Sequence, residues 1–252
     1  MHAEEEAFIR VIRERPDDDA ARLVYADWLD DRDDPRAAYL RAEAEWAALR
    51  PADEQHRPLY RRVSQLAAGL DPEWFAAVSQ VGYLVRREWQ RFSQSWEPYR
   101  GDITTEPIRD WLSAKRELET VFSRFVGPAA TDRRFRIPAD YLAFVTSIPG
   151  SWESGDGWED LYSPVHAAER AADWGRVFGG APNERLELWV HVANTGDMHH
   201  HYLCCDLASP RFGEVAEGED YHPWMDSRSS PLLTHGTTFL QFLREYWPSP
   251  GG

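Results

Sequence analysis

LELWVHVANTGDMHHHYLCCDL, residues 186–207, contains two apolar runs joined by turn-forming residues. The runs 186–193 and 201–207 are rich in the aliphatic, aromatic and β-branched residues that favour strands. The connection begins with Asn194-Thr195-Gly196-Asp197, which favours an antiparallel hairpin over a helical crossover. A third run, 212–216, follows Ser209-Pro210 and predicts another antiparallel strand.

Helical patterns lie on both sides of these strands. A short helix opens at Pro138 and is stopped by Pro149-Gly150, residues 166–174 predict a second helix, and a final helix begins near Thr237. Apolar residues recur at helical spacing in the first and last of these: Tyr141, Leu142, Val145, Ile148, Phe239, Phe242, Leu243 and Tyr246. The sequence therefore predicts an α+β domain in which helices flank a small antiparallel sheet.

Residues 1–56 predict a helical module. Acidic residues 4–6 occupy the first turn of one helix, which Pro16 ends. Asp17 to Asp19 offer capping oxygens to a second helix, and a third begins near Arg36, after the helix-breaking sequence Asp33-Asp34-Pro35. Because these aspartates stand where helices need caps, we interpret them as structural.

Residues 57–107 predict a helical region that connects the module to the α+β domain. One helical stripe is formed by Val85, Trp89, Phe92 and Trp96. An alternating strand over 83–89 is the alternative interpretation. Gly101-Asp102 and Glu106-Pro107 are typical of a linker, and a long amphipathic helix over 108–125 follows it, before Gly127-Pro128.

The charge of the chain restricts the classes of partner. The 252 residues carry a formal net charge of -15, with the acidic excess in 1–56 and 150–252 and a slightly basic segment between them. Nucleic acids and anionic membranes would repel such a chain, so neither is expected as a partner. Two interpretations stay open: the acidity attracts a cationic partner, or it serves only solubility.

Cysteine usage and hydropathy predict a cytoplasmic protein. The two cysteines, Cys204 and Cys205, are adjacent, so we expect them to be reduced and to lie on two faces of one buried strand. The first residues lack the apolar core and cleavage site of a signal peptide, and no apolar run is long enough to span a bilayer.

Catalytic motifs do not stand out. The sequence has no Gly-x-Ser-x-Gly elbow and no Gly-rich phosphate loop, so we expect neither an enzyme nor a cofactor. His199 and His201, with Asp197 or Asp206, suggest a metal-dependent hydrolase as a third functional class. Because no further ligand lies at a spacing typical of metal sites, we expect no metal. We interpret residues 199–201 as a solvated turn.

Two segments combine aromatic and acidic residues. They predict a partner-binding site made of Trp152, Glu153, Asp156, Trp158, Glu159, Asp160, Glu219, Asp220, Tyr221 and Trp224. Indole rings can anchor an interface, while carboxylates steer a cationic partner and pair with its Arg and Lys. In the alternative interpretation the rings pack at sheet edges and the acids solvate loops.

The first module resembles a known family. Pro16-Asp17-Asp18-Asp19, residues 23–29 (LVYADWL) and Asp34-Pro35-Arg36 resemble the "repeat-companion" domain found at the front of many multi-domain planctomycete and myxobacterial proteins. The resemblance covers about residues 3–49. That family has no established activity, so the resemblance identifies a module.

A second resemblance spans roughly 108–248. Residues 136–151 (RIPADYLAFVTSIPGS), the hairpin with Tyr202-Leu203-Cys204-Cys205-Asp206-Leu207, and residues 237–247 (TTFLQFLREYW) resemble the SUKH superfamily (Smi/Knr-type immunity proteins). In that family an Ile-Pro-x-Asp-Tyr helix, a Leu-Asp-Leu-like triplet and a Phe-x-x-Phe-Leu helix recur in this order. The chain departs from the family at the turn, where residues 196–201 replace the frequent Asp-Gly-Gly-Gly.

The SUKH resemblance implies a function. Bacterial members bind and neutralise a toxin, often a nuclease or deaminase, and other members are cytoplasmic adaptors. We therefore expect a non-enzymatic immunity protein whose partner is a cognate toxin with a cationic surface, with a protein-protein interaction adaptor as the alternative. The expected organisation is a repeat-companion-like module (1–56), a connecting region (57–107) and a SUKH-like α+β domain (108–252).

Overall fold

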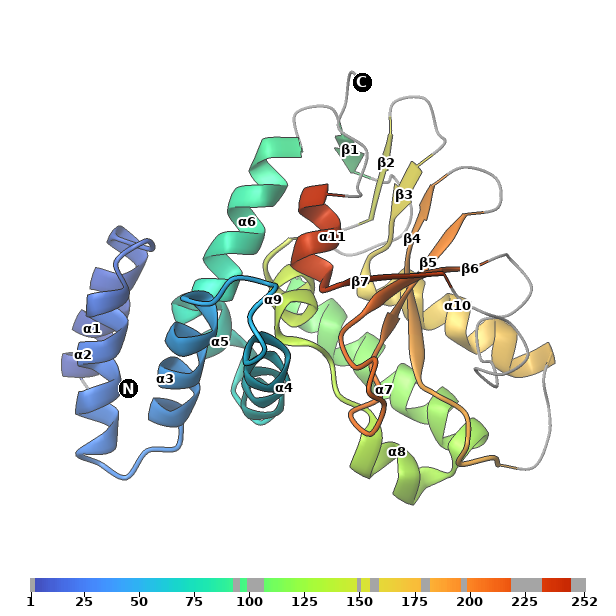
Figure 1. The fold of residues 1–252 in the computed structure, drawn as a ribbon, viewed down its shortest axis with the longest axis horizontal. Helices are drawn as coiled ribbons and strands as arrows, with labels where there is room; N and C mark the ends of the chain where they lie inside the picture. The colour runs from blue at the N-terminus through green and yellow to red at the C-terminus, as the bar shows by residue number, and fades with distance from the viewer. Residues whose placement is uncertain are drawn as a thin grey trace. The chain divides into compact units, whose positions relative to one another are not determined.

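The computed structural model describes residues 3–92, 96–98, 107–148, 151–154, 159–177, 182–195, 199–218 and 233–245. These residues form helices and an antiparallel sheet, as the predicted α+β class requires (Figure 1). The chain divides into two compact units: unit 1 contains Met1–Arg87 and Ile137–Ser147, and unit 2 contains Glu88–Arg136 and Ile148–Gly252. The module boundaries at residues 56 and 107 rest on sequence signatures and stay predictions.

Unit 1 is helical. Its elements are α1 (Ala3–Glu14), α2 (Asp19–Asp30), α3 (Arg36–Ala47), α4 (His56–Ala67), α5 (Pro72–Val78), the start of α6 (Gln80–Phe92) and α9 (Ala139–Ser147). The three N-terminal helices begin and end where the sequence predicts. The side chain of Asp18 caps α2 by accepting a hydrogen bond from the Ala20 amide at 3.0 Å. Asp33 has a φ of 53°, so the chain reverses in the left-handed region before α3.

A buried carboxylate joins three helices of unit 1. Glu43 of α3 is fully buried, and its Oε1 accepts hydrogen bonds from Tyr39 Oη at 2.6 Å and Ser79 Oγ at 2.7 Å. The same oxygen accepts from the Val81 amide at 2.9 Å, in the first turn of α6. A carboxylate is favourable there because the helix N-terminus carries partial positive charge. Glu43 therefore fixes α3 against the junction of α5 and α6.

Asp140, from the Ile-Pro-x-Asp-Tyr motif, is also a structural residue. It is fully buried in α9, and its Oδ1 accepts a hydrogen bond from Tyr60 Oη of α4 at 2.5 Å. Ser64 Oγ accepts from the Ala139 amide at 3.0 Å and so binds the first turn of α9 to the same helix. The motif thus anchors α9 to α4 within unit 1.

Unit 2 contains one sheet with the strand order β1-β2-β3-β4-β5-β6-β7, in which every neighbouring pair is antiparallel. The strands are β1 (Trp96–Pro98), β2 (Trp152–Ser154), β3 (Glu159–Leu161), β4 (Trp189–Thr195), β5 (His200–Cys204), β6 (Val215–Gly218) and β7 (Leu233–Thr237). The three predicted strands are confirmed as β4, β5 and β6. The other four were not predicted, and the alternative strand at 83–89 is wrong because α6 contains those residues. Trp96 lies in β1 instead of continuing the helical stripe.

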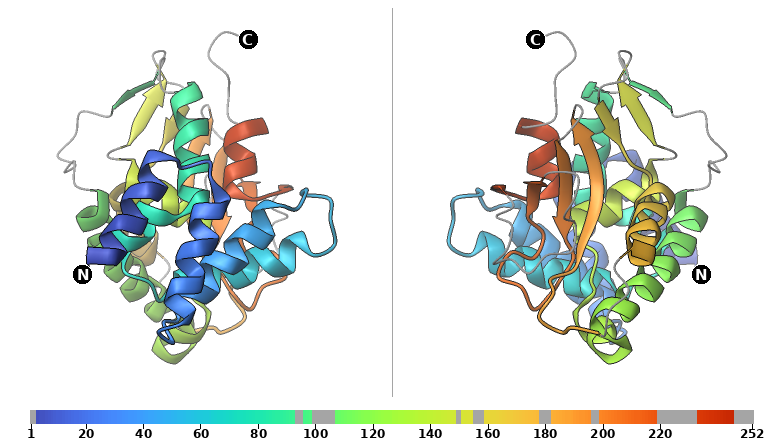
Figure 2. Two further views of the ribbon diagram at one scale, coloured as in Figure 1. Left: turned by 90° about the vertical axis from the view of Figure 1, so that its left-hand side faces the viewer. Right: turned by 90° about the vertical axis from the view of Figure 1, so that its right-hand side faces the viewer.

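Helices lie on both faces of this sheet. α10 (Pro164–Val177) packs beside α7 (Pro107–Val126) and on β4, while α11 (Phe239–Glu245) packs on β7. Figure 2 shows α10 and α11 on opposite sides of the strands. None of the described helices has the length and apolar character that crossing a membrane requires.

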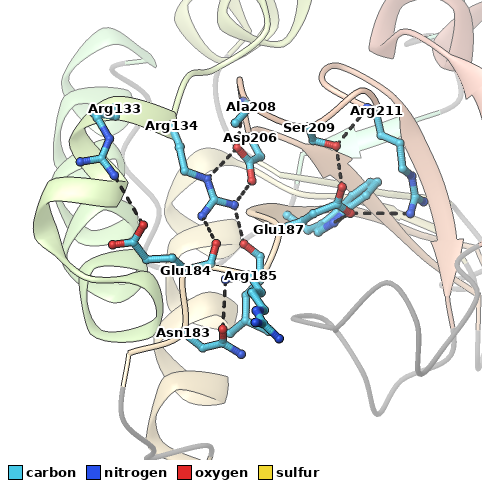
Figure 3. Close-up of polar contacts among 12 residues, drawn as sticks. Arg133, Arg134, Asn183, Glu184, Arg185, Glu187, Asp206, Ala208, Ser209 and Arg211 are labelled. Carbon is cyan, nitrogen blue, oxygen red and sulfur yellow. Dashed lines mark hydrogen bonds and ion pairs between the residues drawn. The ribbon is translucent and has the colours of Figure 1, made fainter.

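An arginine in α8 (Pro128–Arg134) organises the far end of β5 (Figure 3). Arg134 Nε donates to Asp206 Oδ1 at 3.0 Å, and a second guanidinium nitrogen pairs with Asp206 Oδ2. The guanidinium also donates to the carbonyls of Glu184 at 2.6 Å and Leu186 at 2.5 Å. Asp206 is only 1% exposed. The hydrogen bond to Asp206 raises the pKa of the Arg134 guanidinium above its ordinary value. Asp206 of the Cys205-Asp206-Leu207 triplet therefore has a structural partner.

Cys204 and Cys205 are buried free thiols, as the sequence predicts. Cys204 is the last residue of β5, and Cys205 follows it. Burial raises the pKa of the Cys204 thiol to about 12. A thiol in this state is a poor nucleophile at neutral pH, since the thiolate is the reactive form.

Removing the Asp206 carboxylate should strongly destabilise the protein. Asp206→Ala leaves the Arg134 guanidinium, which is 14% exposed, without its counter-charge, and we expect the free energy of unfolding to fall by about 3 kcal/mol. The control is Glu119→Ala, which removes an exposed pair with Lys115 and should lower this free energy by less than about 0.5 kcal/mol. Urea denaturation measures both variants, and equal losses would contradict the structural role of Asp206.

Candidate functional site

The structure brings together two pairs of predicted partner-binding residues. Trp152 and Glu153 lie in β2, and Glu159 and Asp160 lie in the neighbouring strand β3. The other predicted residues fall outside the described part of the chain: Asp156, Trp158, Glu219, Asp220, Tyr221 and Trp224. The segment 151–164 therefore contributes two strands to the sheet.

Strand register places three acidic residues in one cross-strand row, the acidic row of Glu97, Glu153 and Asp160. Glu97 of β1 pairs with Glu153, and Glu153 pairs with Asp160. Neighbouring strands lie about 4.8 Å apart, so these three residues are close neighbours along the backbone of the sheet. Like charges directly opposite each other destabilise a strand pair, by up to about 1 kcal/mol.

Glu97 was missed by the sequence reasoning, which placed it in a connecting region. A signal was present, because the tripeptide Ser-Trp-Glu occurs twice, at 95–97 and at 151–153. The two copies supply β1 and β2, and their glutamates pair with each other in the sheet. A repeated short motif can therefore indicate strand partners that are too short to show alternation.

The acidic row continues into a buried cluster of histidine and tyrosine rings. Asp160 pairs with Asn194 of β4, and Asn194 pairs with His200 of β5. On the same face, the His191 ring lies 4.8 Å from the rings of Tyr162 and Tyr202 and 4.9 Å from the His200 ring, measured between centroids. His191 and His200 are 7% and 6% exposed. The sequence analysis did not bring His191 and His200 together.

Hydrogen bonds define the protonation of this pair. His191 Nε2 lies 3.1 Å from the Ala193 carbonyl and 3.1 Å from His200 Nδ1. A carbonyl only accepts, so we assign the proton to His191 Nε2 and the acceptor role to His200 Nδ1. Burial holds the pKa of His191 well below its ordinary value of 6.5, with further contributions from His200 and from Arg170 of α10. The His191 ring is therefore neutral around pH 7.

A serine and a third histidine connect β2 to α10. Ser151 Oγ accepts from the Ser163 amide at 2.5 Å and lies 3.0 Å from His166 Nδ1. Burial lowers the pKa of His166, and the negative charges of Glu169 and Asp160 partly offset this lowering. Ser151 is 3% exposed, so its hydroxyl orders the start of α10 and is shielded from a substrate in solution.

Residues 199–201 differ from the expected solvated turn. His200 and His201 are buried in β5, and only His199 is exposed, with its Nδ1 2.5 Å from Glu217 Oε1. His201 faces the opposite side from His200, where its Nε2 lies 2.8 Å from Thr195 Oγ1 and its ring 4.9 Å from that of Phe242. Asp206 is held by Arg134. Among the described residues, no group of three or more His, Cys, Asp or Glu side chains could hold a metal ion.

The His191 site should make the protein less stable in acid. The pKa of His191 is lowered in the folded chain, so below pH 6.5 the unfolded chain binds a proton that the folded chain resists. The free energy of unfolding should therefore fall as pH drops from 6.5 to 5. We expect His191→Gln to remove up to about 1.4 kcal/mol per pH unit of this slope.

Urea denaturation of both proteins across this pH range measures the effect. At pH 8 the unfolded chain carries no extra proton at residue 191, so the difference in stability between the two proteins should be constant above that pH. Parallel slopes below pH 6.5 would contradict the assignment of the proton uptake to His191.

Comparisons with known proteins add no relative. No protein-family model matches the chain, and no curated protein and no solved structure matches it either.

Proposed function

We propose that the chain is a non-enzymatic immunity protein that binds and neutralises a bacterial toxin in the cytoplasm. The proposed target is a nuclease or deaminase domain with a basic active-site surface. The observation that carries the proposal is the acidic row of Glu97, Glu153 and Asp160 in neighbouring strands. The resemblance to the SUKH superfamily suggests the same function independently of this row.

The acidic row is suited to a cationic partner. Its residues are about 4.8 Å apart across the strands, a charge spacing of the same order as the phosphates of a nucleic acid strand, about 3.4 Å along the axis. A surface that binds phosphates with Lys and Arg would therefore find a comparable array of negative charge.

The acidic residues of the SUKH-like motifs do not contribute to this surface. Asp140 is 0% and Asp206 is 1% exposed, and each is held by a partner inside its own unit. A buried carboxylate cannot pair with a toxin without losing its internal hydrogen bonds. The motifs support the fold, and the proposed recognition belongs to the strands β1 to β3.

A second candidate function is a protein-protein interaction adaptor. Its supporting observation is an exposed apolar surface on the helical hairpin α1–α2, where Val11 is 41%, Leu23 38% and Val24 55% exposed. Apolar side chains gathered on a surface can mark a protein interaction site. An adaptor that docks there would lose its partner on Val24→Glu, whereas toxin neutralisation through the acidic row would be retained.

A single charge reversal tests the proposed function. Glu153→Lys places a cation between Glu97 and Asp160, so two repulsive pairs become attractive. We expect the free energy of unfolding to rise by about 0.5 to 1 kcal/mol. The association rate with the toxin domain encoded beside this gene should fall about ten-fold at low salt, and less at high salt.

The control is Glu117→Lys, which makes the same charge change at an exposed position of α7. Surface plasmon resonance at two salt concentrations measures association, and a toxin activity assay measures inhibition. Because the variant is expected to be more stable, loss of binding cannot be attributed to unfolding. Wild-type binding without inhibition, or equal rate losses in both variants, would reject the proposed function.

A further inference from the structure

Helix α10 covers the face of the sheet that carries the buried pair His191 and His200. His201 faces the other side of β5, where its ring lies 4.9 Å from the ring of Phe242 in α11. His200 precedes His201 in the strand and so faces away from α11, and α10 and α11 lie on opposite sides of the strands (Figure 2). α10 also packs on β4, the strand of His191. The pair therefore lies beneath α10.

His191 has no suitable place for a second proton while α10 covers it. Its Nε2 hydrogen is directed at the Ala193 carbonyl and at His200 Nδ1, each 3.1 Å from Nε2. A further proton would bind His191 Nδ1, which is buried and has no hydrogen-bond partner among the described residues. An imidazolium donates from both ring nitrogens, so this N–H group would stay unsatisfied and its charge would be buried. Contact with water would remove both costs.

Charged groups around the pair add to this cost. The titratable side chains near it come from β3, β5, α10 and the segment between β3 and α10: Asp160, Tyr162, His166, Glu169, Arg170, His200, His201 and Tyr202. Burial lowers the pKa of His191 most, and His200 and Arg170 lower it further. Burial also lowers the pKa of His166, and the two carboxylates partly offset that lowering. Because Arg170 belongs to α10, a proton on His191 repels the helix that covers it.

α10 is held on the sheet by small side chains. After its first turn and up to residue 172, its buried apolar residues are Ala167, Ala168 and Ala171. α11, on the other face, buries larger side chains: those of Phe239, Leu240, Phe242 and Leu243. An alanine buries a single methyl group, so these contacts hold α10 through little apolar area. Opening of such a helix can precede unfolding of the strands, because β4 and β5 pair over five residues.

We propose that α10 is an acid-sensitive lid, which leaves the sheet when His191 takes up a proton while β4 and β5 stay paired. Leaving gives Nδ1 of His191 access to water and moves Arg170 away from the new charge. Because the closed lid holds the pKa of His191 below its ordinary value of 6.5, opening takes up a proton below that pH and becomes more favourable as pH falls. The lid belongs to unit 2 and does not depend on the proposed toxin.

Hydrogen exchange of the full chain, measured by mass spectrometry at about pH 7.5, 6.5 and 5.5, tests the lid. The rates are corrected for the intrinsic dependence of exchange on pH, so that each peptide reports its own opening. Uptake of one proton with an ordinary pKa of about 6.5 should speed the exchange of α10 about ten-fold between about pH 7.5 and 5.5. At the lowest pH, the α10 peptides should exchange at least about ten-fold faster than those of β4 and β5, because the strands stay paired.

Substitutions assign the effect to His191 and to Arg170. His191→Gln keeps both hydrogen bonds, because its amide group can donate to the Ala193 carbonyl and to His200 Nδ1. Its side chain cannot titrate, so the rise in exchange should fall below about three-fold. Arg170→Gln removes the cation of the lid and should also reduce the rise, whereas the control Arg124→Gln, at an exposed position of α7, should keep it.

Circular dichroism confirms that each variant is folded. The proposal is overturned if α10 and the strands exchange equally at the lowest pH, or if His191→Gln keeps the full rise. It is also overturned if Arg170→Gln behaves as the control does.

Discussion

The bond between Arg134 and Asp206 joins parts of unit 2 that are distant in sequence. Asp206 is almost fully buried, and an ionised carboxylate in that position must be paired to avoid a large desolvation penalty. Arg134 supplies the pair and also binds the carbonyls of Glu184 and Leu186, which precede β4. Backbone bonds extend the contact, since the Arg136 amide donates to the Cys205 carbonyl at 2.9 Å and the Leu207 amide donates to the Arg134 carbonyl at 2.8 Å. The end of α8, the entry to β4 and the exit from β5 are fixed together, and the register of β4 with β5 then positions the strands on either side.

Carboxylates have two physical roles in this acidic chain. Glu43, Asp140 and Asp206 are buried and each joins separate elements through hydrogen bonds or an ion pair. These interactions specify the packing of each unit, because removing either partner leaves a polar group buried and unsatisfied. Other acidic residues cap helices, as Asp18 does for α2 and Asp71 for α5. In the acidic row, the strand register sets acidic residues opposite one another.

The sequence predicted those helices that combine a repeated apolar period with a breaker, whereas the seven-residue α8 was not predicted. Pro16 and the aspartates before α2 and α3 define helix ends by local chemistry alone. The strands β1, β2 and β3 have three residues each, too few for alternation to appear, so they could not be recognised by period. Predicting the candidate site required more than the type of each element, because the acidic row depends on which residues pair across strands. The burial of His200 and His201 was not predicted. The length of the turn between β4 and β5 decides where β5 begins, and the residue types of the turn do not determine that length.

The strands that carry the acidic row pair over few residues. β1 and β2 pair over three residues and β2 and β3 over two, whereas β4 and β5 pair over five. Few backbone hydrogen bonds therefore oppose the repulsion between Glu97, Glu153 and Asp160. Under the proposed function, binding of a cationic partner to these strands is coupled to their pairing. By linkage, a ligand that binds only the paired state stabilises it, by about 2.7 kcal/mol when its concentration is about one hundred times its Kd. Under the proposed function, partner affinity and the local stability of these strands must therefore change together.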